Sequence, residues 1–202
     1  LPVPFAWFSA PRLGNQTRQS YNEDEREDAM AETRYPKKEE LPGTLEFFNK
    51  NLRAGFDWRI EDEYPLALTE RNLNNFRIVK IGDEIVSGAV MKMHIVKCVM
   101  GLFKVSAIGS VVTSPQHRNQ GFSQKILSEC LDASNKQVCD FAILWSDLYD
   151  FYRKLGFELA GSEISIVIQG LMNQTNPNLT IREGANISPE AFLKIYNTHT
   201  TG

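Results

Sequence analysis

Residues 111–124 read VVTSPQHRNQGFSQ, a β-branched run followed by a polar turn with one glycine and then the start of an amphipathic pattern. A glycine-bearing turn that joins a strand to a helix leaves several backbone N–H groups unpaired at the helix N-terminus. The helix dipole favours an anion at the same place. The stretch therefore predicts a strand, a phosphate-binding loop and a helix in succession.

Two common nucleotide-binding loops do not fit this stretch. A P-loop has a lysine followed by serine or threonine directly after its second glycine, and this stretch lacks that pattern. A Rossmann loop has three spaced glycines in a parallel sheet. Here a single glycine follows strands that read as an antiparallel run. The sequence therefore favours a different class of phosphate site.

The flanking sequence supplies strands on both sides of the loop. Before it, β-rich stretches are separated by turn signals such as Gly82-Asp83, which predicts an antiparallel meander. After it, residues 123–133 carry apolar side chains on one side, the spacing of a helix packed on a sheet. Strands are expected at residues 30–35, 76–81, 84–96, 102–113, 141–145 and 163–168, and helices at residues 41–52, 123–133 and 148–155.

The order of these elements predicts the fold class. A strand and a helix precede the meander, and two helix–strand pairs follow it. The expected fold is α/β, with a mixed, mostly antiparallel sheet flanked by helices. Residues 1–29 lack apolar periodicity and are expected to form an irregular N-terminal arm ahead of one domain over residues 30–170.

Composition argues against several classes of protein. The 202 residues carry 22 Lys and Arg against 25 Asp and Glu, a net charge of −3 that disfavours nucleic-acid binding. Three cysteines without a CxxC spacing indicate neither a disulfide framework nor a zinc site, and no metal is implied. No apolar run approaches the roughly 20 residues of a membrane helix, so no membrane association and a cytoplasmic location are expected.

Two segments resemble the motifs of one known family. Residues 118–123, RNQGFS, resemble motif A of GNAT-type N-acetyltransferases, in which a strand runs into [Arg or Gln]-x-x-Gly-x-[Gly or Ala]. Ser123 departs from the pattern but is small, and Asn119 stands where the turn needs a residue that tolerates a positive φ. Residues 149–157, YDFYRKLGF, resemble motif B in the right order and at the right separation. The resemblance covers residues 30–170 and implies the GNAT fold, also called the acyl-CoA N-acyltransferase fold.

The resemblance also implies a site for acetyl-CoA. In the family, the loop amides and the following helix hold the pyrophosphate of coenzyme A, and the strand before the loop pairs with the pantetheine arm. Carried over, the pyrophosphate residues are Arg118, Asn119, Gln120, Gly121, Phe122 and Ser123, and the pantetheine residues are Val111, Val112 and Thr113. By the same analogy, a backbone N–H near Val112 or Thr113 would be the oxyanion donor.

Tyr152 in the second motif is the catalytic candidate. Acetyl transfer from a thioester to an amine needs an acid for the leaving thiolate. A phenol with a pKa of about 10 is protonated at neutral pH and is close enough in pKa to a thiol at about 8.5. The alternative is that Tyr152 is one more aromatic side chain packed beside Phe151 and Phe157. Its position in the motif favours the acid.

The predicted function is acetyl transfer from acetyl-CoA to a primary amine of a small molecule or a protein, by direct attack and without a covalent enzyme intermediate. The alternative is a non-enzymatic acyl-CoA-binding or regulatory module of the same fold. The general base and the acceptor stay open, because acidic residues of this kind are more often solvated surface groups. Candidates for the acceptor cleft are Glu61, Asp62, Glu63, Trp145, Asp147 and Asp150.

The end of the chain repeats a pattern from its first part. Alignment of residue 34 with residue 182 sets Leu45 on Leu193 and Phe48 on Tyr196 without a gap. Ser188 and Pro189 suit a helix N-cap and first turn. One interpretation of residues 171–202 is a linker and the start of a second GNAT-type domain, and the other is a terminal strand and helix on the one domain. A homodimer is the other partner considered.

Overall fold

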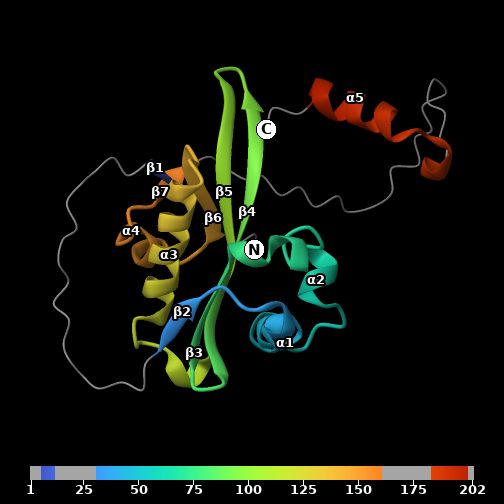
Figure 1. Ribbon diagram of the computed structural model, residues 1–202. Helices are drawn as coiled ribbons and strands as arrows, with labels where there is room; N and C mark the ends of the chain where they lie inside the picture. Colours follow the sequence, from blue (N-terminus) through green and yellow to red (C-terminus); the bar gives the residue numbers. More distant parts are fainter. Residues whose placement is uncertain (1–5, 12–30, 161–182, 200–202) are drawn as a thin grey trace, which may run out of the picture.

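In the computed structural model, which describes residues 6–11, 31–160 and 183–199, a seven-stranded sheet lies at the centre of the molecule (Figure 1). The strands are β1 (Ala6–Pro11), β2 (Glu32–Arg34), β3 (Phe76–Ile81), β4 (Glu84–Cys98), β5 (Gly101–Thr113), β6 (Phe141–Ser146) and β7 (Glu158–Ala160). Their spatial order is β2-β3-β4-β5-β6-β1-β7. β5 and β6 are parallel and the other described pairs are antiparallel, which confirms the predicted mixed sheet.

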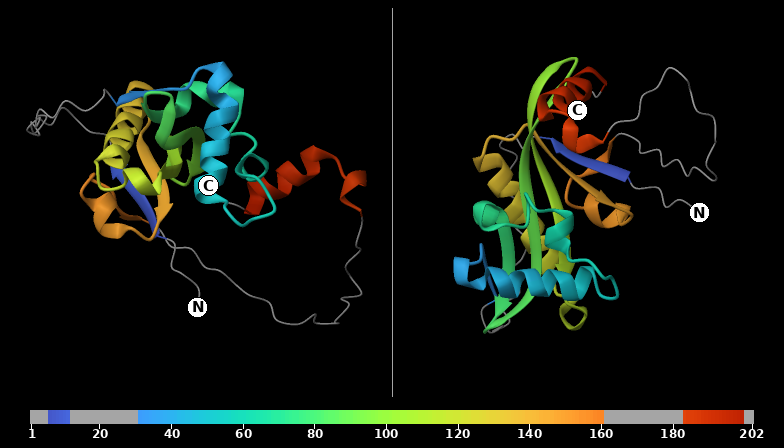
Figure 2. Two further views of the ribbon diagram at one scale, coloured as in Figure 1. Left: turned by 90° about the horizontal axis from the view of Figure 1, so that it is seen from below. Right: turned by 90° about the vertical axis from the view of Figure 1, so that its right-hand side faces the viewer.

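Helices cover both faces of the sheet. α1 (Leu41–Leu52) contacts β4 and β5 on one face, and α3 (Phe122–Lys136) contacts β3, β4, β5 and β6 on the other (Figures 1 and 2). The shorter elements are α2 (Ile60–Glu63), α4 (Tyr149–Arg153), α5 (Pro189–His199) and the 3-10 turns Lys38–Glu40, Glu70–Asn75, Pro115–His117 and Gly184–Asn186. No helix in the described ranges is long and apolar enough to cross a membrane.

The predicted elements from β2 to α4 are confirmed, with small shifts at their ends. α1 begins and ends at the predicted residues, and α3 starts one residue earlier than expected and runs three residues further. The meander is a long hairpin, because β4 and β5 stay paired from Ser87↔Thr113 to Cys98↔Gly101. In Figure 1 this hairpin extends well beyond α1 and α3.

The N-terminal segment is the main correction to the sequence analysis. An irregular arm over residues 1–29 is wrong for Ala6–Pro11, which form β1 and pair antiparallel with both β6 and β7. The local sequence does not show this strand, because a strand inserted between two others depends on residues 130 or more positions away, as in Ala6↔Ser146. β7 was not predicted, and the expected strand at residues 163–168 lies outside the described residues.

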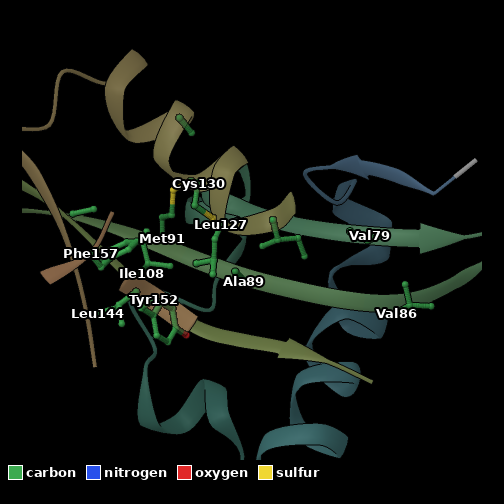
Figure 3. Close-up of a cluster of buried hydrophobic side chains, with 13 residues drawn as sticks. Val79, Val86, Ala89, Met91, Ile108, Leu127, Cys130, Leu144, Tyr152 and Phe157 are labelled. Atoms are coloured by element: carbon green, nitrogen blue, oxygen red, sulfur yellow. The ribbon is translucent and has the colours of Figure 1, made fainter. Parts of the chain in front are cut away.

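Two apolar clusters hold the layers together. The larger lies between the sheet and α3 and includes Met91, Ile108, Leu127 and Tyr152 (Figure 3). The smaller lies under α1 and α2, where Phe48 packs with Phe76, Val90 and Val112 among others. The strands β4 and β5 therefore contribute to both clusters, one on each face.

At the C-terminal end, α5 starts as the sequence predicts. The backbone N–H of Ala191 donates to the Ser188 hydroxyl at 3.4 Å, so Ser188 caps a helix whose first residue is Pro189. Four apolar side chains of α5 are half exposed, at 51–59%: Phe192, Leu193, Ile195 and Tyr196.

A carboxylate at the start of α1 ties β2, β3 and α1 together. Glu40 accepts two hydrogen bonds from the Arg34 guanidinium, at 2.6 and 2.8 Å, and a third from Lys80 Nζ at 3.0 Å. The Lys37 backbone N–H donates to it as well, at 2.8 Å. The Arg34 guanidinium holds the pKa of Glu40 well below its usual range, and Lys37 and Lys80 act in the same direction against the opposing effect of burial.

Replacing Glu40 with glutamine is expected to lower the free energy of unfolding at pH 7 by about 1 to 3 kcal/mol, because Lys80 loses its carboxylate partner and Arg34 keeps only Glu32. A depressed folded-state pKa adds stability above the unfolded-state pKa of about 4.3, and that contribution is lost as the pH falls toward the folded-state pKa. The difference in the free energy of unfolding between wild type and Glu40→Gln should therefore be largest at pH 7 and decrease steadily below about pH 4. Urea unfolding across this range measures it, with the exposed Glu39→Gln as control. An equal loss at pH 7 and pH 2 would contradict the assignment.

Candidate functional site

The predicted phosphate-binding loop joins β5 to α3. Asn119 and Gly121 both have a positive φ, 63° and 79°, as the sequence analysis required of Asn119. Gly121 is the N-cap of α3. Within the described part of the chain, none of the backbone N–H groups of residues 118–123 donates to another protein group. A row of free donors therefore stands at the N-terminus of a four-turn helix.

Ser123, the departure from the family pattern, belongs to a chain of hydroxyl groups. Its Oγ lies 2.7 Å from Thr113 Oγ1, which lies 2.7 Å from Ser87 Oγ. Because the Ser87 hydroxyl donates to the Val112 carbonyl at 3.0 Å, it must accept from Thr113, and Thr113 must accept from Ser123. This chain links the first turn of α3 to the ends of β5 and β4, so the serine supports the loop geometry.

Three basic side chains flank the loop. Arg118 is exposed. Lys125 donates from Nζ to the Ala31 carbonyl at 3.1 Å, which gives it a structural partner away from the loop. His117 shares a hydrogen bond between its Nδ1 and the Ser114 hydroxyl at 2.8 Å. Among the three, Arg118 is the one best placed to add charge to a bound anion.

β5 separates from β6 just before the loop. The two strands pair at Val105↔Phe141, Ser106↔Ala142 and Ala107↔Ile143 and at no later position. Past this point β5 has a bulge, because Val90 opposes Gly109 whereas Gly88 opposes Val112. Ser110, inside the bulge, has a positive φ of 53°. A bulge bends and twists its strand, and residues 108–113 are left with one backbone edge that no described strand pairs with.

A groove of about 1020 Å³ occupies this opening. Its floor is formed by β4 and β5, one wall by the end of α1, α2 and the segment after it, and the other wall by the end of β6 and α4. The lining residues with polar groups are Arg53, Glu63, Tyr64, Lys92, His94, Ser110, Trp145, Ser146 and Tyr152. Val111 also lines the groove, whereas the side chains of Val112 and Thr113 are buried.

Tyr152 is packed among aromatic side chains and also lines the groove. Its ring is packed edge-on against Phe151 and Phe157, with centroids 5.0 and 5.9 Å apart, and the residue is 5% exposed. Figure 3 shows the ring beside Leu144 and Ile108. The residue nevertheless lines the groove, and its hydroxyl has the Ser146 side chain as a hydrogen-bond partner. Burial raises the pKa of Tyr152, helped by the nearby Asp147, so the phenol stays protonated at neutral pH.

The acidic residues 61–63 have separate environments. Glu61 is bound by Asn49 Nδ2 at 2.8 Å and by Arg59, and the Asn49 side chain also accepts from the Ile60 backbone N–H. Asp62 is exposed. Glu63 lines the groove, but its carboxylate is paired with Arg53, whose Nε lies 2.7 Å away. None of the three therefore presents an unpaired carboxylate to the groove.

Lys92 and His94 are groove residues that the sequence analysis did not identify. They lie two and four residues after Val90 on β4, and all three residues line the groove, so they share the groove-facing side of the strand. The period of two along a predicted strand was the available signal, since it puts Lys92 and His94 on one face. The sequence alone does not show that this face borders a groove. Asp147 and Asp150 line a separate hollow of about 480 Å³ beside α4, whereas Trp145 belongs to the groove.

None of the three cysteines lines the groove. Cys130 and Cys139 are buried, and burial raises the pKa of Cys130 to about 12, so this thiol is protonated and inert. Cys98 lies at the turn of the long hairpin. Within the described ranges no group of three His, Cys, Asp or Glu side chains could hold a metal ion.

Comparison with known proteins gives one family match and several structural likenesses. A family model described as an acetyltransferase (GNAT) domain matches residues 32–160, within the domain predicted from the sequence. No curated protein sequence matches the chain.

Three solved structures illustrate the structural likeness. A GCN5-related N-acetyltransferase from Anabaena variabilis has a TM-score of 0.55 and 17% identity over 65% of this chain and 33% of that one. A probable N-acyltransferase from Enterococcus faecalis has a TM-score of 0.52 and 20% identity, and the match covers 62% of this chain and 31% of that one. A Trypanosoma brucei acetyltransferase has a TM-score of 0.53 and 20% identity, and the match covers 69% of this chain and 100% of that one. Identities this low show a shared fold alone, and the match to each of the first two proteins covers about a third of its length.

Proposed function

The chain belongs to the GNAT family of acetyltransferases, and from this premise we propose that it transfers an acetyl group from acetyl-CoA to a primary amine. Acyl transfer is the general activity of the family. A coenzyme A thioester as the donor is supported by one observation above all, the open edge of β5 that leads from a loop of free N–H donors to the groove lined by Tyr152.

The residues around the opening fit coenzyme A. The N–H groups of residues 118–123 and the dipole of α3 would hold the pyrophosphate, with Arg118 adding charge. The dipole contributes only about 0.3 to 1 kcal/mol at an exposed site, so several N–H donors must share the binding. The unpaired edge at residues 111–113 would pair with the pantetheine arm as a neighbouring strand does.

The groove residues suit direct attack on a thioester, the group that bound acetyl-CoA supplies. Tyr152 would donate its phenolic proton to the sulfur when the carbon–sulfur bond breaks, and would regain a proton from solvent. The attacking amine gives up its proton to water in the groove, and no side chain is assigned as base. A backbone N–H near Val112 or Thr113 would bind the carbonyl oxygen as it becomes charged. With no cysteine in the groove, a covalent thiol intermediate has no candidate.

Two measurements test this proposal. Titration calorimetry with acetyl-CoA tests the cofactor site, and release of free thiol in the presence of an amine panel tests turnover. Binding and thiol release together support the enzyme. Binding without thiol release for any amine favours the alternative of a regulatory acyl-CoA-binding module, and absence of binding contradicts both.

Gly121→Val is expected to weaken acetyl-CoA binding by about tenfold, because a β-branched residue disfavours the φ of 79° by about 1 to 2 kcal/mol and the loop would change shape. Added bulk is not the cause, since a Cβ at Gly121 meets no atom within 4 Å. Gly121→Asn is the matched control, because asparagine tolerates a positive φ and should keep most of the affinity. Equal affinities of the valine and asparagine variants would contradict the role of this backbone conformation.

We further propose that residues 171–202 are a linker and the start of a second domain of the same kind. The half-exposed apolar side chains of α5 and its match to the α1 pattern support this. A natural protein chain that ended at Gly202 would contradict the proposal, and a homodimer that covers α5 is the competing arrangement.

A further inference from the structure

The free charge in the groove is positive. Of the charged side chains that line it, Arg53 and Glu63 neutralise each other in an ion pair. Lys92 lines the same groove, and no carboxylate of the described residues lies within ion-pair distance of its ammonium group. His94 stands two residues further along the same face of β4. A groove that binds a polycationic acceptor would instead be lined by unpaired carboxylates.

The position of Lys92 separates it from the cofactor phosphates. Lys92 is paired with Ala107, six residues before Thr113 at the end of β5. At about 3.3 Å per residue, that places it roughly 20 Å along the strand from the phosphate-binding loop. The bulge at Val90 and Gly109 lies only two residues from Lys92, or about 7 Å. Lys92 therefore stands at the acceptor end of the groove, within reach of a small molecule whose amine lies near the bulge.

The groove that Lys92 lines also has exposed apolar side chains. Tyr64, Leu66, Trp145 and Leu148 line the groove and are 50%, 74%, 42% and 59% exposed. Side chains of this kind bind the hydrocarbon part of a ligand, while a few polar groups fix its orientation. The groove thus combines one cation that has no carboxylate partner among the described residues with exposed apolar side chains.

We propose that the acceptor is a small primary amine that also carries an anionic group, a carboxylate or a phosphate, which Lys92 binds while His94 flanks it. This inference rests on the proposed function, since it names the substrate class for the same site. Lys92 fixes the anion, the apolar walls hold the carbon skeleton, and the amine is left pointing toward the bulge and Tyr152. An acceptor with a second cation in place of the anion would face the Lys92 ammonium unfavourably.

The experiment compares matched amines that differ in the anion. Phenylalanine is paired with 2-phenylethylamine, and phosphoethanolamine with ethanolamine, so the two pairs separate a carboxylate from a phosphate; putrescine serves as a dicationic probe. Dissociation constants are measured by titration calorimetry on the whole chain, with and without coenzyme A. Wild type should bind at least one anion-bearing member about tenfold or more tightly than its partner, the effect of one charge-assisted hydrogen bond.

Lys92→Met should abolish this preference while it leaves the affinity for the anion-free amine within about twofold. Lys97→Met is the matched control, because Lys97 lies on the same strand, does not line the groove and is exposed. A wild-type preference for putrescine or for the anion-free members would overturn the proposal. So would a preference that survives Lys92→Met.

The two proposals fail in different ways. The substrate inference is read from ratios of affinities, which need no turnover, and the Lys92 substitution should leave acetyl-CoA affinity unchanged because of its distance from the loop. The proposed function fails when acetyl-CoA does not bind or no amine releases thiol. If the protein acetylates anion-free amines and Lys92→Met has no effect, the proposed function stands and the proposed substrate class is wrong.

Discussion

Tyr152→Phe is expected to lower the rate of acetyl-CoA-dependent thiol release by about 10² to 10⁴-fold, the range that a positioned general acid contributes. Two tyrosines line the groove, Tyr64 and Tyr152. Tyr152 is buried, whereas Tyr64 is 50% exposed. Without that hydroxyl, the thiolate must leave unprotonated or take its proton from water. Thiol release at saturating amine is the measurement.

The substitution should separate catalysis from folding and binding. Phenylalanine keeps the ring contacts with Phe151 and Phe157 and loses the hydroxyl that pairs with Ser146. The fold and the affinity for acetyl-CoA should therefore change little, and calorimetry should give a dissociation constant within about twofold of wild type. A loss of kcat at nearly constant cofactor affinity is the pattern expected of an interaction made mainly in the transition state.

Tyr149→Phe is the control on the same helix. Tyr149 lines the smaller hollow beside α4 and not the groove, so its hydroxyl has no access to the acceptor end. Its removal should leave thiol release within a few-fold of wild type. Full activity of Tyr152→Phe, or equal losses in the two variants, would show that Tyr152 only packs.

The pH dependence of activity is a second test of the role of Tyr152. Because burial raises the pKa of Tyr152, its acid form persists throughout the neutral and mildly alkaline range. Activity should rise from pH 6 toward pH 9 as the amine acceptor loses its proton, with no fall attributable to Tyr152 below about pH 10. The acid role therefore sets no alkaline limit in the range where the assay is run.

The parts of the site that the sequence predicted are those built from neighbouring residues. The turn needs a positive φ at residues 119 and 121, and asparagine and glycine are the residue types that tolerate it. The sequence of the turn therefore predicts its backbone conformation. Tyr152 was identified because a short motif surrounds it. For the same reason the α1 and α3 helices, whose apolar periods lie within one segment, appear where they were expected.

The parts that the sequence did not predict depend on distant partners. β1 is a strand because β6 and β7 flank it, and nothing within Ala6–Pro11 states that pairing. The charge of the groove depends on the ion pair between Arg53 and Glu63, which neutralises one of the acidic residues named as candidates for the acceptor cleft. It depends equally on the strand register that carries Lys92 into the groove. Strand register and side-chain pairing arise only when distant segments come together in the sheet, so they are hard to predict from a single sequence.

Phe48→Ala is expected to lower the free energy of unfolding by about 3 to 5 kcal/mol, the usual cost of removing a fully buried aromatic ring. Phe48 is 0% exposed and forms the centre of the cluster under α1, with the Phe76 ring 6.4 Å away. The same cluster includes Val90 and Val112, which flank the bulge of the groove floor. Urea unfolding measures the loss, with Phe56→Ala as control, because Phe56 is 54% exposed and should cost less than about 1 kcal/mol.

A double-mutant cycle with Gly88 locates the origin of that cost. A Cβ at Gly88 would lie 2.8 Å from an edge carbon of the Phe48 ring, so the ring fills the space that the glycine leaves open. Gly88→Ala alone should destabilise the protein by about 1 to 3 kcal/mol through overpacking. In the Phe48→Ala background the clash disappears, and the added methyl group fills part of the cavity. The two substitutions should therefore couple favourably by more than about 1 kcal/mol, whereas strictly additive losses would mean that the ring does not rest on Gly88.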